Sequence, residues 1–367
     1  MSPSDPATKE FAVILNENAR RVTRRLLTAA QEFGPRIALY SSRTKEEAYQ
    51  ILRELMDKGV RRIISGGGDG TFVTLVSQAK RLLEEQNQRL QMVGRSARQE
   101  LSRISLPEFG ILKLGTGNSF APLLGIQKGL APIRMLARGE NFATREVRLL
   151  EAEDQCFTFC GLGWDARILN DYMWLKKHVN SRFVSRLVQS LLGYLAAMTL
   201  RTIPSVLLTR RKVRTTVRNL GDRVFRILPG NRFLRLRCRQ GDVFYQGPCN
   251  AIGVATTPYY GYGLKAFPYA MEKPGLMHLR IVTAGVAELI THAWPIWNGS
   301  YRSPNFLEFL VDNVHMSFSR QMPYQRGGDA EGYRRELSVR MSDLTVDLLD
   351  FRRLLGPSPL APAAPSP

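Results

Sequence analysis

Residues 60–71 have the sequence VRRIISGGGDGT, in which a short apolar run leads into a turn with four glycines. The run predicts a buried strand, and the residues from Phe72 to Gln86 predict a helix. Glycine lets backbone N–H groups approach a phosphate closely, and the start of a helix adds partial positive charge. This strand, turn and helix therefore predict an anion-binding loop.

Strand and helix patterns alternate on both sides of this loop. Helical spacing of apolar residues predicts one helix that Ser42 or Thr44 caps and Gly59 ends, because Ser and Thr favour helix starts and Gly favours helix ends. Such alternation indicates βαβ units and a mostly parallel, Rossmann-like sheet. The strands are expected at 11–15, 36–40, 60–64 and 109–114, and further helices at 19–33 and 130–138.

The sequence changes character near residue 145. From residue 146 onward many short β-type runs follow one another, interrupted by one amphipathic helical stretch at 182–201. We therefore predict two domains, an α/β domain at 8–145 and a β-rich, sandwich-like domain at 146–355. The Pro-rich end at 356–367 is expected to be an unstructured tail.

The net charge of +20 predicts attraction to anionic surfaces, either nucleic acid or acidic lipid headgroups. The tryptophans and histidines form no nucleic-acid signature, so nucleic acid is not expected as a partner. The four cysteines lack metal-site spacing and are interpreted as reduced thiols. The first residues lack a signal-peptide pattern, and the longest apolar stretch, 187–200, is too short to span a bilayer, so a cytoplasmic protein is expected.

Asp69 is an acid inside an anion-binding loop, where it would repel phosphate unless it bound a metal ion or accepted a proton. Either role suits phosphoryl transfer, in which the protein positions groups and Mg²⁺ offsets charge. The alternative is an ordinary tight turn in which Asp69 caps the following helix. The loop by itself leaves both interpretations open.

A second glycine turn, Gly115-Thr116-Gly117-Asn118, again follows a predicted strand and precedes apolar residues compatible with a helix. The carboxyl ends of parallel strands lie along one edge of a sheet, where open α/β folds bind their ligands. The two glycine turns are therefore expected to converge on one site.

Together these segments resemble the diacylglycerol kinase catalytic-domain family, which includes sphingosine and ceramide kinases and bacterial soluble lipid kinases and has an NAD kinase-like fold. The resemblance rests on GGGDGT at 66–71, LGTGNSFA at 114–121 and the strand-ending Asn16. It continues through FCGLGWDA at 159–166, GYGLK at 261–265 and GDAE at 328–331, and so spans about residues 10 to 350.

The resemblance implies an ATP-dependent lipid kinase, associated peripherally with membranes, that phosphorylates a diacylglycerol-like or sphingoid hydroxyl. ATP would lie between the domains with Mg²⁺ at Asp69, and the lipid hydroxyl would approach Asp69 and Asp329. The implied catalytic residues are Asp69, Asp329 and Glu331. The implied nucleotide-binding residues are Asn16, Gly67, Gly68, Gly70, Thr71, Gly115, Thr116, Gly117 and Asn118.

The sequence also departs from the family pattern. Val73 and Thr74 stand where the family usually has Asn-Glu, and Lys113 and Ser119 replace its proline and acid. At 273–278, KPGLMH replaces an acidic segment that holds a structural Mg²⁺ in bacterial members, so that metal site is expected to be absent. An NAD kinase-type enzyme and a non-catalytic lipid- or nucleotide-binding homologue are the alternatives. The oligomeric state is left open, a homodimer included.

Overall fold

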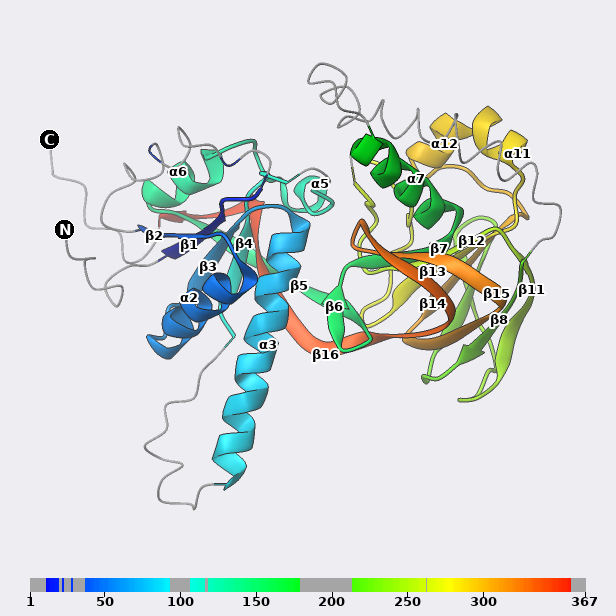
Figure 1. The fold of residues 1–367 in the computed structure, drawn as a ribbon, viewed down its shortest axis with the longest axis horizontal. Helices are drawn as coiled ribbons and strands as arrows, with labels where there is room; N and C mark the ends of the chain where they lie inside the picture. The colour runs from blue at the N-terminus through cyan, green and yellow to red at the C-terminus, as the bar shows by residue number, and fades with distance from the viewer. Residues whose placement is uncertain are drawn as a thin grey trace, which may run out of the picture. The chain divides into compact units, whose positions relative to one another are not determined.

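The computed structural model describes residues 11–19, 22, 28, 37–92, 106–115, 118–178, 213–261 and 263–357. The chain divides into unit 1, Met1–Val147 with Leu344–Pro367, and unit 2, Arg148–Asp343 (Figure 1). The helices expected at 19–33 and 182–201 lie largely or wholly outside the described residues, as does most of the expected tail.

Unit 1 is built on a parallel sheet with the strand order β2-β1-β3-β4. Its helices α2 and α3 pack against each other and against β2 and β3. Thr44 caps α2 by accepting the N–H of Glu47 at 3.0 Å, and Gly59 follows the helix with φ +69°, as predicted. The elements are β1 Phe11–Asn16, β2 Ile37–Ser42, α2 Lys45–Asp57, β3 Arg62–Gly66, α3 Asp69–Met92, β4 Glu108–Ile111, α5 Ala121–Leu124 and α6 Ala131–Ala137.

The last strand, β16 Asp329–Pro357, runs from unit 2 back into unit 1, where Leu348 pairs in parallel with Phe109 of β4. The sequence had placed residues 344–355 in the second domain and 356–367 in a tail. The observed boundary differs from the predicted one because the end of β16 packs within unit 1. Asp350 of β16 is fully buried and accepts from Arg145 of unit 1 at 3.4 Å and from Arg352 of its own strand at 3.1 Å.

Unit 2 is an antiparallel β structure in which β10, β9, β14, β13, β12, β7 and β15 follow one another side by side. Strand β15 also pairs with β8 and β16, and β8 pairs with β11. The elements are β5 Glu140–Ala152, which begins in unit 1, β6 Gln155–Phe157, β7 Phe159–Gly163, α7 Trp164–His178, β8 Val213–Asn219, β9 Val224–Leu228, β10 Arg232–Arg235, β11 Val243–Cys249, β12 Ala251–Ala255, β13 Met277–Val282, α11 Val286–Thr291, α12 Ala293–Trp297, β14 Phe306–Val311 and β15 Asn313–Arg326.

One apolar core holds unit 2 together, and it includes Leu162, Val217, Val254, Leu279 and Val311 from five different strands. The alternating burial of β8 fits a strand with one face on this core and the other in solvent. The predicted fold class, a parallel α/β first part followed by a β-rich second part, is confirmed. Within the described residues, no helix is both long and apolar enough to cross a bilayer.

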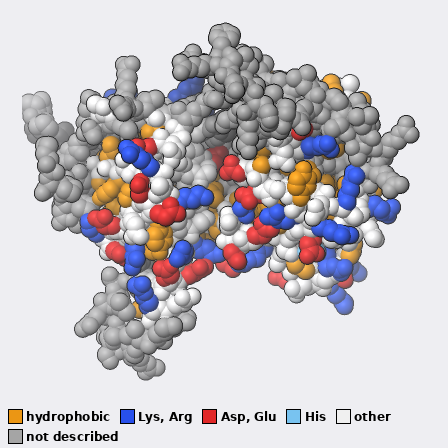
Figure 2. All heavy atoms as spheres, viewed as in Figure 1, with side chains coloured by type: hydrophobic (Ala, Val, Ile, Leu, Met, Phe, Trp, Pro, Cys, Tyr) orange, Lys and Arg blue, Asp and Glu red, His pale blue; other side chains and the backbone are white. Residues whose placement is uncertain are grey.

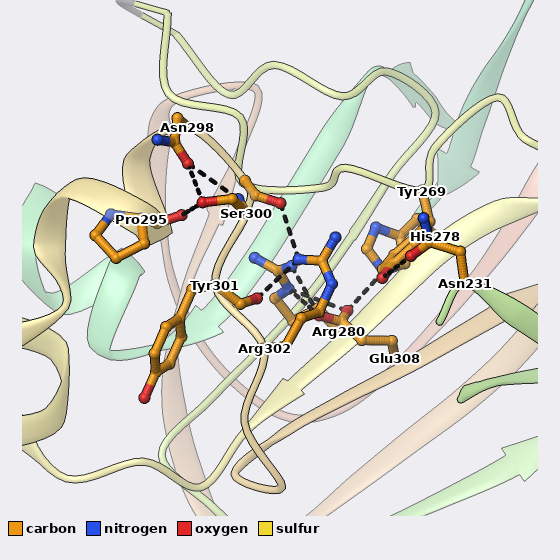
Figure 3. A network of polar contacts seen from close by, with 11 residues as sticks. Asn231, Tyr269, His278, Arg280, Pro295, Asn298, Ser300, Tyr301, Arg302 and Glu308 are labelled. Carbon is orange, nitrogen blue, oxygen red and sulfur yellow. Dashed lines mark hydrogen bonds and ion pairs between the residues drawn. The ribbon is translucent and has the colours of Figure 1, made fainter. Parts of the chain in front are cut away.

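A charged cluster is buried between β13 and β14 (Figure 3). Glu308 accepts hydrogen bonds from Arg280 at 2.7 Å and contacts His278 Nε2 at 2.7 Å. Burial alone would raise the pKa of Glu308, but Arg280 and His278 outweigh it and lower that pKa to about 2. Burial lowers the pKa of His278, and the neighbouring Glu308 carboxylate opposes that effect.

Replacing Arg280 by Met should leave the Glu308 charge buried without its arginine partner. Removing one partner of a buried ion pair lowers the free energy of unfolding by roughly 3–5 kcal/mol. Urea unfolding followed by far-ultraviolet circular dichroism measures the loss. Arg226→Met, at an exposed position of β9, is the control and should change stability by less than about 0.5 kcal/mol. Equal effects of the two substitutions would contradict this account of the cluster.

Candidate active site

The carboxyl ends of the parallel strands β1, β3 and β4 bring three predicted segments to one edge of the unit 1 sheet. Asn16 ends β1, and its Nδ2 donates to Thr71 Oγ1 at 3.1 Å. The chain after β4 continues beside the first glycine loop, because Leu114 N–H donates to Gly67 O at 3.0 Å. The predicted convergence of the two glycine turns is therefore present for their described residues.

The two loops meet backbone against backbone at Gly68 and Gly115. A Cβ atom built on Gly68 would lie 2.7 Å from Gly115 Cα, and one built on Gly115 would lie 2.4 Å from Gly68 Cα. Neither position has room for a side chain, because the atoms in the way belong to the main chain. Gly70 differs, since a Cβ there would meet nothing within 4 Å.

Asp69 begins α3 and connects the two loops. Its Oδ2 accepts the backbone N–H of Ser119, whereas its Oδ1 is buried without a hydrogen-bond partner among the described residues. The Asp69 side chain thus bonds to the other loop. In the first turn of the helix, Gly68 O accepts the Phe72 N–H at 3.1 Å. Burial raises the pKa of Asp69, and N–H groups of Ser119 and Phe120 offset part of that effect.

Other buried polar atoms without partners in the described part of the chain lie on the same loops. They are Ser65 Oγ, Asn118 Oδ1 and Ser119 Oγ. Asn118 has φ +52°, and its Nδ2 donates to Gly115 O at 2.7 Å, which leaves its amide oxygen available. Unpaired buried polar atoms are uncommon in proteins, and their concentration on two converging loops marks a candidate binding site.

A cluster of three phenylalanine side chains packs next to the loops. Phe72 of α3 packs edge-on against Phe109 of β4 and Phe120, with ring centroids 5.9 and 5.4 Å apart. All three side chains are fully buried. The cluster fixes the start of α3 against the segment that follows the second loop.

Of the predicted nucleotide-binding residues, Thr116 and Gly117 lie outside the described residues.

The substituted family positions on α3 bond to the helix itself. Thr74 Oγ1 donates to Gly70 O at 2.9 Å, and Ser77 Oγ donates to Val73 O at 2.8 Å. Neither Val73 nor Thr74 offers a carboxylate, so Asp69 is the one acid on the first loop and the first turns of α3. Any positive charge at this edge therefore meets a single carboxylate from that segment.

The predicted acids of the second domain lie on the β15–β16 hairpin. Gly327 and Gly328 form its turn with φ +59° and +91°, and Asp329 pairs with Arg326 at the start of β16. Asp329 is exposed, whereas Glu331 accepts from Arg326 Nη2 at 2.8 Å. Asp69 belongs to unit 1 and the hairpin acids to unit 2, so their approach to one lipid hydroxyl stays a prediction.

Sequence analysis did not identify a buried network behind this hairpin. Asp165, at the start of α7, accepts from Tyr260 Oη at 2.7 Å and from Gln325 Nε2 at 3.3 Å. Gln325 Oε1 in turn accepts the N–H of Gly328 at 3.0 Å and so holds the turn before Asp329. Burial raises the pKa of Asp165. The only sequence signal was Asp165 within the 159–166 motif, since Tyr260 and Gln325 come from distant segments.

The loop chemistry fits a nucleotide with Mg²⁺. Carboxylate and amide oxygens, such as Asp69 Oδ1 and Asn118 Oδ1, are ligands that Mg²⁺ accepts, and glycine loops at helix starts bind phosphates. Within the described ranges no cluster of three or more His, Cys, Asp or Glu could hold a metal by itself. Mg²⁺ commonly uses one or two carboxylates together with substrate phosphates and water, which agrees with this sparse set.

Comparison with known proteins finds similar folds and similar sequences. The chain shares its fold with a diacylglycerol kinase from Bacillus anthracis str. Sterne, with a TM-score of 0.53 and 15% identity over 93% of this chain and 97% of that one. Residues 10–151 match the family described as "Diacylglycerol kinase catalytic domain". The match covers the first part of the chain and agrees with the family resemblance that the sequence predicted.

Relatives with similarity over most of the chain are named as lipid kinases. "Probable lipid kinase YegS-like" of Klebsiella pneumoniae (strain 342) is 24% identical over 290 residues, which cover 78% of this chain and 76% of the relative. "Probable lipid kinase YegS" of Salmonella newport (strain SL254) is 23% identical over 306 residues, covering 82% and 81%. The similarity therefore extends beyond the first unit into the β-rich unit.

The glycine contact predicts different outcomes for two neighbouring substitutions. Gly68→Ala should lower the free energy of unfolding by roughly 2–3 kcal/mol, because the new methyl group would push the second loop away. Gly70→Ala enters open space within α3 and should leave stability unchanged or raise it by about 0.5–1 kcal/mol. Denaturant unfolding of both variants makes the comparison, and equal destabilisation would contradict the contact between the loops.

Asp69→Asn should stabilise the protein at neutral pH. The folded-state pKa of Asp69 lies above its ordinary value of 3.8, so stability is lost as pH rises through 3.8 toward the folded pKa. Removing the charge should raise Tm at pH 7 by roughly 2–4 °C for about 1 kcal/mol. Below about pH 4 the difference should vanish. Scanning calorimetry at both pH values tests this, and a lower Tm at pH 7 would show that the carboxylate is compensated.

Proposed function

We propose that the chain is an ATP-dependent lipid kinase that transfers the γ-phosphate to a hydroxyl of a diacylglycerol-like or sphingoid lipid at a membrane surface. The observation that carries the proposal is the junction of the two glycine loops, where Asp69 Oδ1 and Asn118 Oδ1 are buried without partners in the described part of the chain. The match of residues 10–151 to the diacylglycerol kinase catalytic domain, and the similarity to relatives named as probable lipid kinases, support the substrate class.

In this proposal the loops bind the nucleotide through backbone N–H groups. Gly67, Gly68 and Gly70 leave the β3–α3 turn open to phosphate oxygens, and Asn16 holds Thr71 by a hydrogen bond. Bound Mg²⁺ would offset charge on the transferring phosphoryl group. Asp69, the one acid of the first loop, would orient that ion through Oδ1 while Oδ2 stays on the Ser119 N–H.

Asp329 is proposed as the base that takes the proton of the lipid hydroxyl. Its exposed position on a glycine turn leaves room for an acceptor, and the buried Gln325 fixes that turn. Glu331 is proposed to keep the hairpin in place through its ion pair with Arg326, because its carboxylate is already engaged. A positioned general base contributes typically about 10²–10⁴-fold to rate.

Basic residues support action at an anionic membrane. Arg214 and Arg218 of β8 are exposed, as are Arg232 and Arg235 of β10. In Figure 2, Lys and Arg side chains gather over the part of unit 2 that carries β8 and β11. Such a surface attracts acidic headgroups by about 1 kcal/mol per basic residue near the membrane. The proposal therefore includes peripheral membrane association and an anionic lipid partner.

The test is an assay with γ-labelled ATP and Mg²⁺ against diacylglycerol, sphingoid bases, ceramide and NAD. Wild type should give a labelled lipid, Asp69→Asn should give none, and Asp329→Asn should reduce the rate at least about 10²-fold. Glu336→Gln, at an exposed acid on the same strand as Asp329, is the control and should keep wild-type activity.

Two results would replace this proposal. Labelled NADP would favour the NAD kinase alternative. Retained ATP binding without any labelled product would indicate a non-catalytic homologue, which the substitutions Val73, Thr74 and Ser119 make the second candidate.

A further inference from the structure

Two short helices of unit 2 present apolar side chains to solvent. Helices α11 and α12 connect β13 to β14, and neither contains a buried residue. Trp294 is 74% exposed and Ile290 is 53% exposed, and Trp294 is the most exposed large hydrophobic residue of the described chain. Figure 1 shows the pair at one end of unit 2, outside the strands. Clustered exposed apolar residues mark interaction sites.

Apolar residues dominate the two helices, as they do in helices that lie at a membrane interface. Residues 286–297 read VAELITHAWPIW, with Glu288 as the one acid. Tryptophan is enriched at the boundary between headgroups and acyl chains, where its ring is apolar and its N–H can remain hydrated. A pair of helices too short to span a bilayer can still lie in its interfacial layer.

The polar groups of the pair are already bonded within the protein. Thr291 Oγ1 donates to Ala287 O at 2.9 Å, and His292 Nδ1 lies 3.0 Å from Glu288 O. At the end of α12, Ser300 Oγ donates to Asn298 Oδ1 at 2.6 Å (Figure 3). Unpaired polar groups are costly in lipid, so this internal bonding permits shallow insertion.

The one acid is directed to the protein and held there. Glu288 accepts from Tyr301 Oη at 2.9 Å, Ser303 Oγ at 2.6 Å and Asn305 Nδ2 at 2.8 Å. These three donors belong to the segment that leads into β14. They fix the orientation of Glu288, the one acid of residues 286–297, and hold its carboxylate against the segment that leads into β14.

Two cations lie beside the pair. Lys265 bonds the end of α12 through its N–H to Trp297 O at 2.8 Å, and Arg302 Nη1 donates to Gly299 O at 2.9 Å. Neither side chain is ion-paired with a carboxylate in the described part of the chain, and the Arg302 guanidinium lies over the Tyr269 ring, 4.9 Å from its centroid. An apolar surface next to cations without a carboxylate partner is complementary to a bilayer with anionic headgroups.

We propose that α11 and α12 dock the protein on an anionic bilayer. Trp294 and Ile290 enter the headgroup boundary, and Lys265 and Arg302 face lipid phosphates. This inference rests on the proposed lipid kinase function, because it specifies the surface through which that enzyme reaches its substrate. A second copy of the chain on the same surface is the competing occupant.

Co-sedimentation with vesicles of phosphatidylcholine and phosphatidylglycerol tests the surface. Trp294→Ala should weaken vesicle binding about tenfold, and Trp294→Phe should keep most of the affinity, because the buried apolar area decides the effect. Leu354→Ala, at an apolar residue of β16 that is 58% exposed, is the matched control and should bind like wild type. Lys265→Gln should weaken binding at low salt and have little effect at high salt.

Two outcomes would overturn the docking surface. One is wild-type vesicle binding by Trp294→Ala. The other is unchanged vesicle binding together with a shift from dimer to monomer in light scattering, which would assign the surface to a second copy. The kinase proposal is tested separately with a short-chain, monomeric lipid, which Trp294→Ala should phosphorylate at the wild-type rate. Loss of vesicle binding in a protein without kinase activity would leave the docking surface standing and remove only the enzyme proposal.

Discussion

The candidate active site depends on the contact between the Gly68 and Gly115 backbones. Strands β3 and β4 are parallel neighbours, so the loops that follow them emerge side by side, but only residues without Cβ atoms allow the two main chains to touch. At that separation Asp69 can reach the Ser119 N–H across the gap. A side chain at either glycine would separate the carboxylate from its donor and spread the buried oxygens apart.

The buried carboxylates of Glu308 and Asp69 are held in opposite ways. Glu308 has Arg280 and His278 beside it, and these groups lower its pKa. Asp69 accepts a backbone N–H and has no cation paired with it in the described part of the chain, and burial raises its pKa. The first arrangement suits a structural ion pair that is complete within the protein. The second stays incomplete until a positive charge or a proton arrives, as expected of a functional site that sacrifices some stability.

Local patterns in the sequence predicted what is local in the fold. The strand before Gly66, the cap at Thr44 and the turn at Gly59 each depend on a few adjacent residues, and each is present. The return of β16 to unit 1 depends on pairing between Leu348 and Phe109, which no local pattern reveals. The contacts of Asp165 with Tyr260 and Gln325 were not predicted either, because these residues are far apart in the sequence. Helix α3 was predicted to begin at Phe72, but it begins at Asp69. The Phe72 N–H donates to Gly68 O, so the end of the glycine turn forms the first turn of the helix.

The substitutions after the first loop affect how a metal could be bound. Thr74 and Ser77 place their hydroxyl groups on carbonyls of α3, so this helix adds no acid to Asp69 near its start. One carboxylate and a neutral amide give Mg²⁺ a weak set of protein ligands, whereas phosphate oxygens of a bound nucleotide add charge. Metal and nucleotide should therefore bind together rather than in sequence. Under the proposed function, the loss of family acids would shift metal binding onto the nucleotide and would leave phosphate binding to the glycine loops.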